Sequence, residues 1–187
     1  MARPTSPHRR LLAVLGALLA AAATAAGCTR PQPTRSVAVP GGGSGLPATV
    51  AHVVDGDTVD LRVGGGPGAE VERARLLGID TPETVKPDTP VECFGPEASA
   101  RTKELLPPGT AVVVQRDREA RDRFGRLLLY VWRQQDGLFI NRSLVADGYA
   151  RTLSIEPNTA HRADLAAVLG TARATKAGLW GTCPPAG

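Results

Sequence analysis

The nine residues Arg75-Leu76-Leu77-Gly78-Ile79-Asp80-Thr81-Pro82-Glu83 decide how this chain is interpreted. Their apolar members predict a strand covered on both faces. Arg75 enters this strand, and Asp80 and Glu83 leave it in a turn that proline stiffens. One guanidinium and two carboxylates at one corner suit a hard cation or a phosphate group. The same residues also suit a ligand-free capped turn, with Asp80 or Thr81 as the cap and Glu83 near a helix dipole.

Charge is distributed unevenly along the sequence. The whole chain carries 22 Lys and Arg against 18 Asp and Glu, a formal charge of +4. Residues 1–45 contain five arginines and no acidic residue, so the remainder holds 17 basic and 18 acidic residues, a net charge of −1. A domain in this remainder has no general positive field, and an anion site in it must come from local arrangement.

Residues 1–28 have the pattern of an export signal. A basic segment precedes an uncharged apolar segment, 11–23, and small residues then lead to Cys28. The Ala-Ala-Gly-Cys ending resembles the lipobox of bacterial lipoproteins, although Ala25 stands where leucine is usual. We expect export, with the protein on the extracellular face of the membrane through a lipid on Cys28. Ordinary cleavage would instead release a secreted protein, and the uncharged stretch 11–29 is long enough for an uncleaved anchor.

The three cysteines, Cys28, Cys93 and Cys183, agree with the lipoprotein interpretation. An odd count in an exported chain leaves one thiol over. A lipid on Cys28 leaves Cys93 and Cys183 to form a disulfide in an oxidising compartment. Such a bridge would close a loop of about 90 residues and contribute roughly 4 kcal/mol in the chain-entropy account. Zinc is a poor alternative because no CxxC or CxxH spacing accompanies these cysteines.

The next segment, 29–47, is expected to be a disordered linker. It contains four prolines, a glycine-rich run and almost no large apolar residues. The folded domain is therefore expected to span residues 48–183.

Within that domain the patterns predict an α+β fold of five strands and three helices. The Asp55-Gly56 pair predicts a hairpin between the first two strands. A helix between the third and fourth strands is the order of an OB-fold barrel, which commonly binds oligonucleotides. The expected strands are 48–54, 58–63, 70–79, 111–114 and 127–132, and the expected helices are 96–106, 140–147 and one capped by 157–159 that ends near 176.

Four motifs in order carry a family resemblance. They are Asp55-Gly56-Asp57-Thr58-Val59, the opening stretch 75–83, Phe94-Gly95-Pro96-Glu97-Ala98-Ser99, and Asp122-Arg123-Phe124-Gly125-Arg126-Leu127. Any one of them is weak, but the four together, from about residue 48 to residue 180, resemble the staphylococcal nuclease (thermonuclease) family.

The resemblance implies a calcium site. In the family, the equivalents of Asp57 and Asp80 bind Ca²⁺ together with the carbonyl oxygen of the residue at Thr81. Hard oxygen ligands of this kind are what Ca²⁺ takes, with carbonyls and waters completing its shell. Asp57 taken alone is more simply a turn residue.

The same resemblance assigns the catalytic side chains. Glu83 matches the residue that orients or deprotonates the attacking water, a role that requires hydrogen-bond reach. Arg75 and Arg126 match the active-site arginines, which can neutralise charge on the phosphate oxygens of the transition state. Taken alone, Arg75 would more simply be paired with a carboxylate, and Arg126 would more simply be solvated in its charged loop.

The function implied is that of a monomeric Ca²⁺-dependent nuclease that hydrolyses DNA and RNA and leaves 3′-phosphates. A non-catalytic OB-fold nucleic-acid-binding module is the alternative, and it predicts loss of at least one catalytic or metal-binding side chain. A calcium-binding lipoprotein of structural role would not explain the two arginines.

Some positions depart from the family pattern. Leu153 and Ile155 stand where the founding member has two tyrosines beside the bound nucleotide, and Phe124 replaces a third tyrosine. Loss of aromatic stacking, worth about 1–3 kcal/mol per base, puts base affinity in doubt. A Cys93–Cys183 bridge would also be a departure, and it would tie down the loop after Glu83. His161 is expected to be a surface residue of the last helix.

Overall fold

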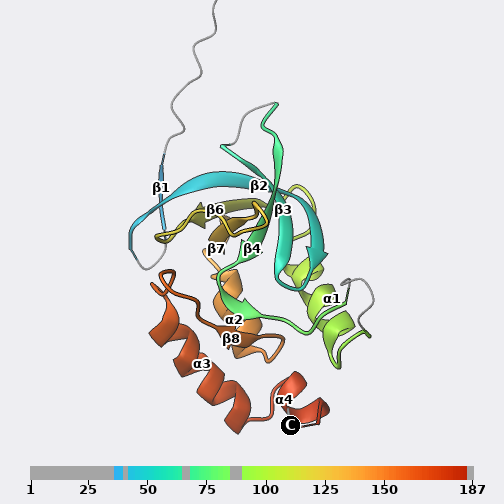
Figure 1. Cartoon of the computed structure of the whole chain (residues 1–187). Coiled ribbons are helices and arrows are strands. Elements are labelled where there is room, and N and C mark those ends of the chain that lie inside the picture. Colours follow the sequence, from blue (N-terminus) through green and yellow to red (C-terminus); the bar gives the residue numbers. More distant parts are fainter. Residues whose placement is uncertain (1–35, 40–41, 65–67, 85–89, 185–187) are drawn as a thin grey trace, which may run out of the picture. The chain divides into compact units, whose positions relative to one another are not determined.

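The structure is a computed structural model that describes residues 36–39, 42–64, 68–84 and 90–184 (Figure 1). The expected export signal with Cys28 lies outside the described residues, as do residues 29–35 and 40–41 of the expected linker. In the part of the chain that is described, no helix is both long enough and apolar enough to cross a bilayer.

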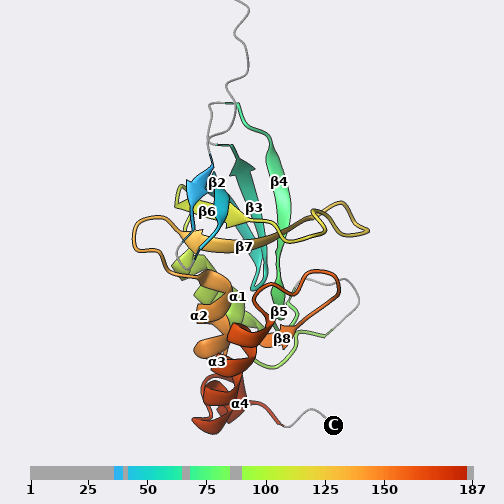
Figure 2. The same cartoon turned by 90° about the vertical axis from the view of Figure 1, so that its left-hand side faces the viewer.

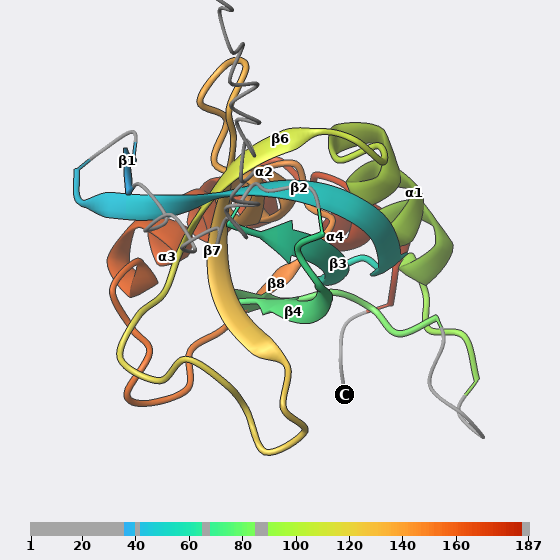
Figure 3. The same cartoon turned by 90° about the horizontal axis from the view of Figure 1, so that it is seen from above.

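Five strands of the described chain close into a barrel. β2 (Ser44–Asp55), β3 (Thr58–Val63) and β4 (Val71–Leu76) form an antiparallel meander. β6 (Ala111–Gln115) and β7 (Leu127–Arg133) form a second antiparallel pair. Pairing of β2 with β6, and parallel pairing of β4 with β7, closes the sheet, as Figure 3 shows from above. The predicted OB-fold barrel is confirmed.

The barrel begins earlier in the chain than the composition predicts. β1 (Val37–Ala38) pairs with the first residues of β2, and β2 itself starts at Ser44. The expectation of disorder is therefore wrong for residues 36–39 and 42–47. Val39 is buried, and Val37 and Leu46 pack against buried apolar clusters, so three apolar side chains help to hold this Pro- and Gly-rich segment on the barrel.

The expected third strand, 70–79, is divided into two. β4 ends at Leu76, and β5 (Gly78–Asp80) leaves the barrel to pair with β8 (Arg151–Leu153), a strand that the sequence patterns did not reveal. Leu77 between them is fixed by two hydrogen bonds: its N–H donates to the Leu129 carbonyl oxygen at 2.9 Å, and its carbonyl oxygen accepts from Asn141 Nδ2 at 2.9 Å.

Helices lie at one end of the barrel (Figures 1 and 2). α1 (Gly95–Leu105) packs against β2, and α2 (Ile140–Ala146) lies between β7 and α3 (Arg162–Ala174). α4 (Leu179–Thr182) follows α3 as one short turn. These helices fall where the sequence predicts them, except for α4, which was not expected.

The predicted cap of the last helix is wrong. α3 begins at Arg162 rather than near Thr159. Asn158 instead turns toward the loop before β7, where its side chain accepts a hydrogen bond from Glu119 N at 2.8 Å and donates one to Glu119 O at 3.2 Å.

The expected surface position of His161 is also wrong. Its ring lies 4.4 Å from that of Tyr130, 5.0 Å from that of Phe139 and 5.6 Å from that of Trp132. Burial in this cluster lowers the pKa of His161, although the charges of Asp164 and Asp117 offset part of the effect. The residue therefore helps to pack α3 against β7.

Candidate active site

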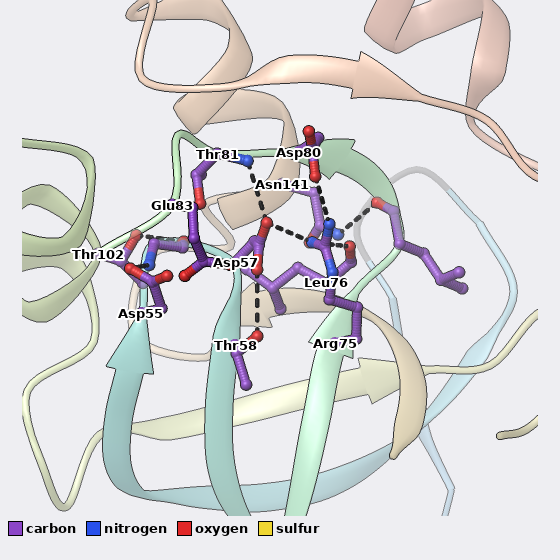
Figure 4. A network of polar contacts seen from close by, with 12 residues as sticks. Asp55, Asp57, Thr58, Arg75, Leu76, Asp80, Thr81, Glu83, Thr102 and Asn141 are labelled. Atoms are coloured by element: carbon purple, nitrogen blue, oxygen red, sulfur yellow. Dashed lines mark hydrogen bonds and ion pairs between the residues drawn. The ribbon is translucent and has the colours of Figure 1, made fainter. Parts of the chain in front are cut away.

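Asp57 occupies the turn between β2 and β3 and is 7% exposed. Its Oδ2 accepts a hydrogen bond from Thr81 N at 3.0 Å, and its Oδ1 accepts one from Thr58 Oγ1 at 3.1 Å (Figure 4). Burial raises the pKa of the Asp57 carboxyl, and the guanidinium of Arg75 counteracts part of that rise. The hairpin carboxylate is thus joined directly to the turn that follows β5.

Arg75, in β4, connects the two aspartates on which the predicted metal site depends. Its Nη1 lies 2.5 Å from Asp57 Oδ2, and its Nη2 donates a hydrogen bond to Asp80 Oδ1 at 2.8 Å. The arginine side chain is only 15% exposed, whereas that of Asp80 is 47% exposed. The guanidinium therefore holds one buried and one accessible carboxylate at the same corner.

Glu83 lies in the turn after β5, beside Asp55 at the end of β2. Glu83 Oε1 accepts a hydrogen bond from Thr84 N at 3.0 Å. Asp55 Oδ1 accepts one from Thr84 Oγ1 at 2.6 Å and one from Gly56 N at 2.8 Å. Burial raises the pKa of Asp55; the bonds from Thr84 and Gly56 counteract this, and the nearby Glu83 carboxylate adds to it. Asp55 therefore ties the Glu83 turn to the hairpin that carries Asp57.

Arg126 lies at the end of the loop that joins β6 to β7. Gly125 before it has a φ of 80°, in the left-handed region that glycine adopts readily in a tight turn. Asp122 holds the arginine in place, because its Oδ2 accepts from Arg126 Nε at 2.7 Å and its Oδ1 accepts from Arg126 N at 3.0 Å. The guanidinium also lies over the ring of Phe124, 5.5 Å from its centroid.

Parallel pairing of β4 with β7 brings the two arginines to one end of the barrel. Ala74 pairs with Leu127, and Arg75 pairs with Leu128. Arg126 directly precedes Leu127, so it lies at the same end of these two strands as Arg75. A cleft of about 600 Å³ opens there, and all six of the residues predicted to act in the site line it. The lining residues are Val54, Asp55, Asp57, Thr58, Arg73, Arg75, Asp80, Thr81, Glu83, Arg123, Phe124 and Arg126.

The sequence is similar to those of known proteins. The model of the staphylococcal nuclease homologue family matches residues 73–182. The chain belongs to this family. It is 44% identical to a thermonuclease of Staphylococcus intermedius over 113 residues, which are 60% of this chain and 63% of that protein. It is 36% identical to a thermonuclease of Staphylococcus hyicus over 131 residues, covering 70% and 73%. It is 34% identical to the endonuclease YncB of Bacillus subtilis over 133 residues, covering 71% and 60%.

The donor set of this staphylococcal nuclease homologue fits a hard cation. Asp57 and Asp80 offer carboxylate oxygens, and the backbone of Thr81 lies between them in the same corner. The hydroxyl oxygen of Thr81 is buried and has no hydrogen-bond partner in the described part of the chain. No group of three His, Cys, Asp or Glu side chains among the described residues is arranged to hold a metal by itself, so carbonyl and water oxygens would complete the shell.

A second cleft, of about 530 Å³, adjoins the first. Arg75, Arg126 and Phe124 line both clefts, and the second continues to Leu153 and Ile155. The apolar side chains here are unusually accessible: Phe124 is 69%, Ile155 64% and Leu153 41% exposed. An apolar shelf, consisting of Phe124, Leu153 and Ile155, therefore extends from the arginines.

Two contacts that support the site were missed at the sequence level. Thr102 in α1 is fully buried, and its Oγ1 donates to the Gly56 carbonyl oxygen at 2.6 Å, which fixes the hairpin turn. Gly56 is also packed tightly, because an added Cβ would lie 2.6 Å from Thr81 Oγ1. Thr102 lies in none of the motifs that indicated the site, so only the fold shows its role.

Proposed function

We propose that the chain is a Ca²⁺-dependent nuclease that hydrolyses phosphodiester bonds of DNA and RNA and leaves 3′-phosphates. The observation that carries this proposal is that one cleft brings together the predicted carboxylates and the predicted arginines, which are Asp57, Asp80, Glu83, Arg75 and Arg126. Relatives bearing the names thermonuclease and endonuclease support it, although the chain spans only 63% of the length of the S. intermedius protein and 60% of that of YncB.

Asp57, Asp80 and the Thr81 carbonyl oxygen would hold the Ca²⁺ ion, which would supply positive charge beside the scissile phosphate. Glu83 accepts a hydrogen bond from the attacking water and takes up its proton. The water oxygen forms a bond to phosphorus, the bond from phosphorus to O5′ breaks, and the departing oxygen takes a proton from solvent.

The arginines stabilise the charge that grows on the non-bridging oxygens. Asp122 engages Nε of Arg126, which keeps the two terminal nitrogens of this side chain as donors to phosphate. The apolar shelf beside them gives the adjacent base an aliphatic surface at Leu153 and Ile155, so binding should depend less on stacking and more on the phosphate.

The test is cleavage of single- and double-stranded DNA and of RNA by the full chain with Ca²⁺, with a chelator, and as Glu83→Gln. We expect cleavage with Ca²⁺ only, a loss of at least about 100-fold in Glu83→Gln, and products that become ligatable only after treatment with a 3′-phosphatase. Cleavage that persists in chelator would contradict the proposal.

Binding of nucleic acid without cleavage under any condition would favour the alternative, a non-catalytic OB-fold binding module. A binding module would not need the catalytic and metal-binding side chains. All of those predicted are present in the cleft, which favours the enzyme.

We also propose that the protein is a monomer, exported and held on the outer face of the membrane by a lipid on Cys28. The apolar segment 11–23 and the position of Cys28 support export and the lipid anchor. The Cys93–Cys183 disulfide suits an oxidising compartment. Incorporation of a labelled fatty acid in the native chain, and its loss in Cys28→Ser, is the expected result; labelling that survives the substitution would refute the anchor.

A further inference from the structure

The disulfide connects two segments that are far apart in the sequence. Cys93 and Cys183 are 90 residues apart and are bonded, with their Cα atoms 5.9 Å from each other, which confirms the predicted pair. Cys93 lies two residues before α1, and Cys183 directly follows α4 as its C-cap. The bond therefore joins the chain that enters α1 to the end of the helical region.

The Cys93 side of this bond lies directly behind Glu83. Glu92 N donates a hydrogen bond to the carbonyl oxygen of Glu83 at 3.0 Å, and Gly95 N donates one to the Glu92 carbonyl oxygen at 3.0 Å. Gly95 is buried, and a Cβ on it would lie 2.9 Å from the carbonyl oxygen of Glu83. The backbone of Glu83 therefore contacts Glu92, directly before Cys93, and Gly95, two residues after it.

The Cys183 side is anchored in the core. Cys183 N donates to the Leu179 carbonyl oxygen at 3.0 Å, and Leu179 is only 2% exposed. Leu179 N in turn donates to the Gly148 carbonyl oxygen at 2.9 Å, just beyond α2. A continuous series of short contacts therefore runs from the end of α2, through α4 and the disulfide, to the backbone of Glu83.

The residue after Cys93 is in an uncommon conformation. Phe94 has a φ of 71°, in the left-handed region that residues other than glycine seldom adopt. Such a conformation persists only when its surroundings impose it. Phe94 is held by its ring contact with Tyr149, 5.4 Å between centroids, by the hydrogen bond that its carbonyl oxygen accepts from Ala98 N at 3.0 Å, and by the disulfide at its N-terminal neighbour. Without the disulfide, one of these restraints is lost.

We propose that the Cys93–Cys183 disulfide is a positioning element for Glu83, holding the backbone of that residue in register with the aspartates of the cleft, so that the rate of hydrolysis depends on the bond being formed. This inference rests on the proposed function. The cysteines act through Glu83 and do not touch the substrate. Since displacement of a catalytic group by about 1 Å can cost on the order of 100-fold in rate, a loosened Glu83 turn should be visible in kcat.

The experiment compares two full chains, both carrying Cys28→Ser so that no third thiol can mispair: one with the disulfide, and one with Cys93→Ala and Cys183→Ala. At a temperature where both are folded, and at saturating Ca²⁺, kcat should fall by about 10- to 100-fold while KM changes by less than about 2-fold. A role in overall stability alone would leave kcat of the folded protein unchanged.

Hydrogen exchange gives a second readout that requires no catalysis. The amides of Glu92 and Gly95 should exchange at least about tenfold faster in the double variant, while those of β3 and β7 keep their relative protection. Val168→Ala, on α3 and away from the cleft, is the matched control, because it lowers global stability without touching this segment. Its kcat should match that of the parent.

Unchanged kcat in the folded double variant would overturn the proposal, as would faster exchange spread evenly over the barrel. If the double variant does not fold, reduction of the parent by a thiol reagent gives the same comparison without substitution. If the parent cleaves no nucleic acid, the proposed function fails, and the exchange pattern alone then supports or overturns the placement of the Glu83 segment by the disulfide.

Discussion

Replacing Asp122 by asparagine tests whether Arg126 must be held in one orientation. Asp122 Oδ1 accepts from Phe124 N at 2.9 Å and from Arg126 N at 3.0 Å, while its Oδ2 accepts from Arg126 Nε at 2.7 Å. Burial alone would raise the pKa of Asp122, but the bonds from Arg126 and Phe124 outweigh it and lower that pKa, so the carboxyl is charged at neutral pH. An asparagine keeps the oxygen for the two backbone bonds and loses only the one to the guanidinium.

The size of the effect follows from that single bond. A hydrogen bond to a charged group contributes about 1.5–3 kcal/mol when it is buried. The Arg126 side chain is 29% exposed and that of Asp122 17%, so solvent screening reduces the loss to about 1 kcal/mol of unfolding free energy. The same loosening should lower kcat/KM by about 5- to 10-fold, because a freed guanidinium is no longer positioned for the phosphate.

Urea unfolding followed by tryptophan fluorescence measures the first quantity, and oligonucleotide cleavage at saturating Ca²⁺ measures the second. Asp136→Asn is the matched control, since Asp136 also accepts from an arginine side chain and from a nearby backbone N–H, but in a turn outside the cleft. Wild-type kcat/KM in Asp122→Asn, or an equal loss in Asp136→Asn, would refute the reasoning.

Three further predictions concern the surroundings of the site. Asn141→Leu should lower the free energy of unfolding by about 2–5 kcal/mol, because it leaves buried backbone groups of Leu77 and β7 unpaired; an unchanged urea midpoint would contradict this. Gly56→Ala should lower it by about 1–3 kcal/mol through overlap with Thr81, measured by thermal unfolding, and a more stable variant would argue against the contact. Burial lowers the folded-state pKa of His161. The contribution of the neutral imidazole to stability is therefore present above about pH 6.5 and is lost as the pH falls through the folded-state pKa. The melting temperature of His161→Gln should fall less between about pH 7 and pH 5 than that of the wild type.

Local patterns predicted the barrel, and the family resemblance carried by four short motifs predicted the residues of the cleft. The Asp-Gly turn fixes a hairpin, and alternation in residues 58–63 matches β3 without error. The arginine and the carboxylates of the opening stretch lie within nine residues, and the fold needs only to bring Asp57 and Arg126 to them.

Contacts between distant segments could not be predicted in this way. Asn158 resembled a helix cap by residue type, and its true partner, Glu119, lies 39 residues away in the sequence. His161 resembled a surface residue because the rings around it come from β7 and from the residue before α2. The early start of β2 goes with the burial of Val39 and the partial burial of Leu46, in a segment whose composition is typical of disorder.

The parallel pairing of β4 with β7 has a kinetic consequence. The cleft draws on residues within 54–58, 73–83 and 123–126, and the last of these segments arrives only when β7 has paired with a strand some fifty positions earlier. Pairings between strands so distant in the chain form slowly and cooperatively. Partly folded chains should therefore be inactive. After dilution from urea, cleavage should recover at the rate at which the barrel closes, so that nuclease activity reports on this step of folding.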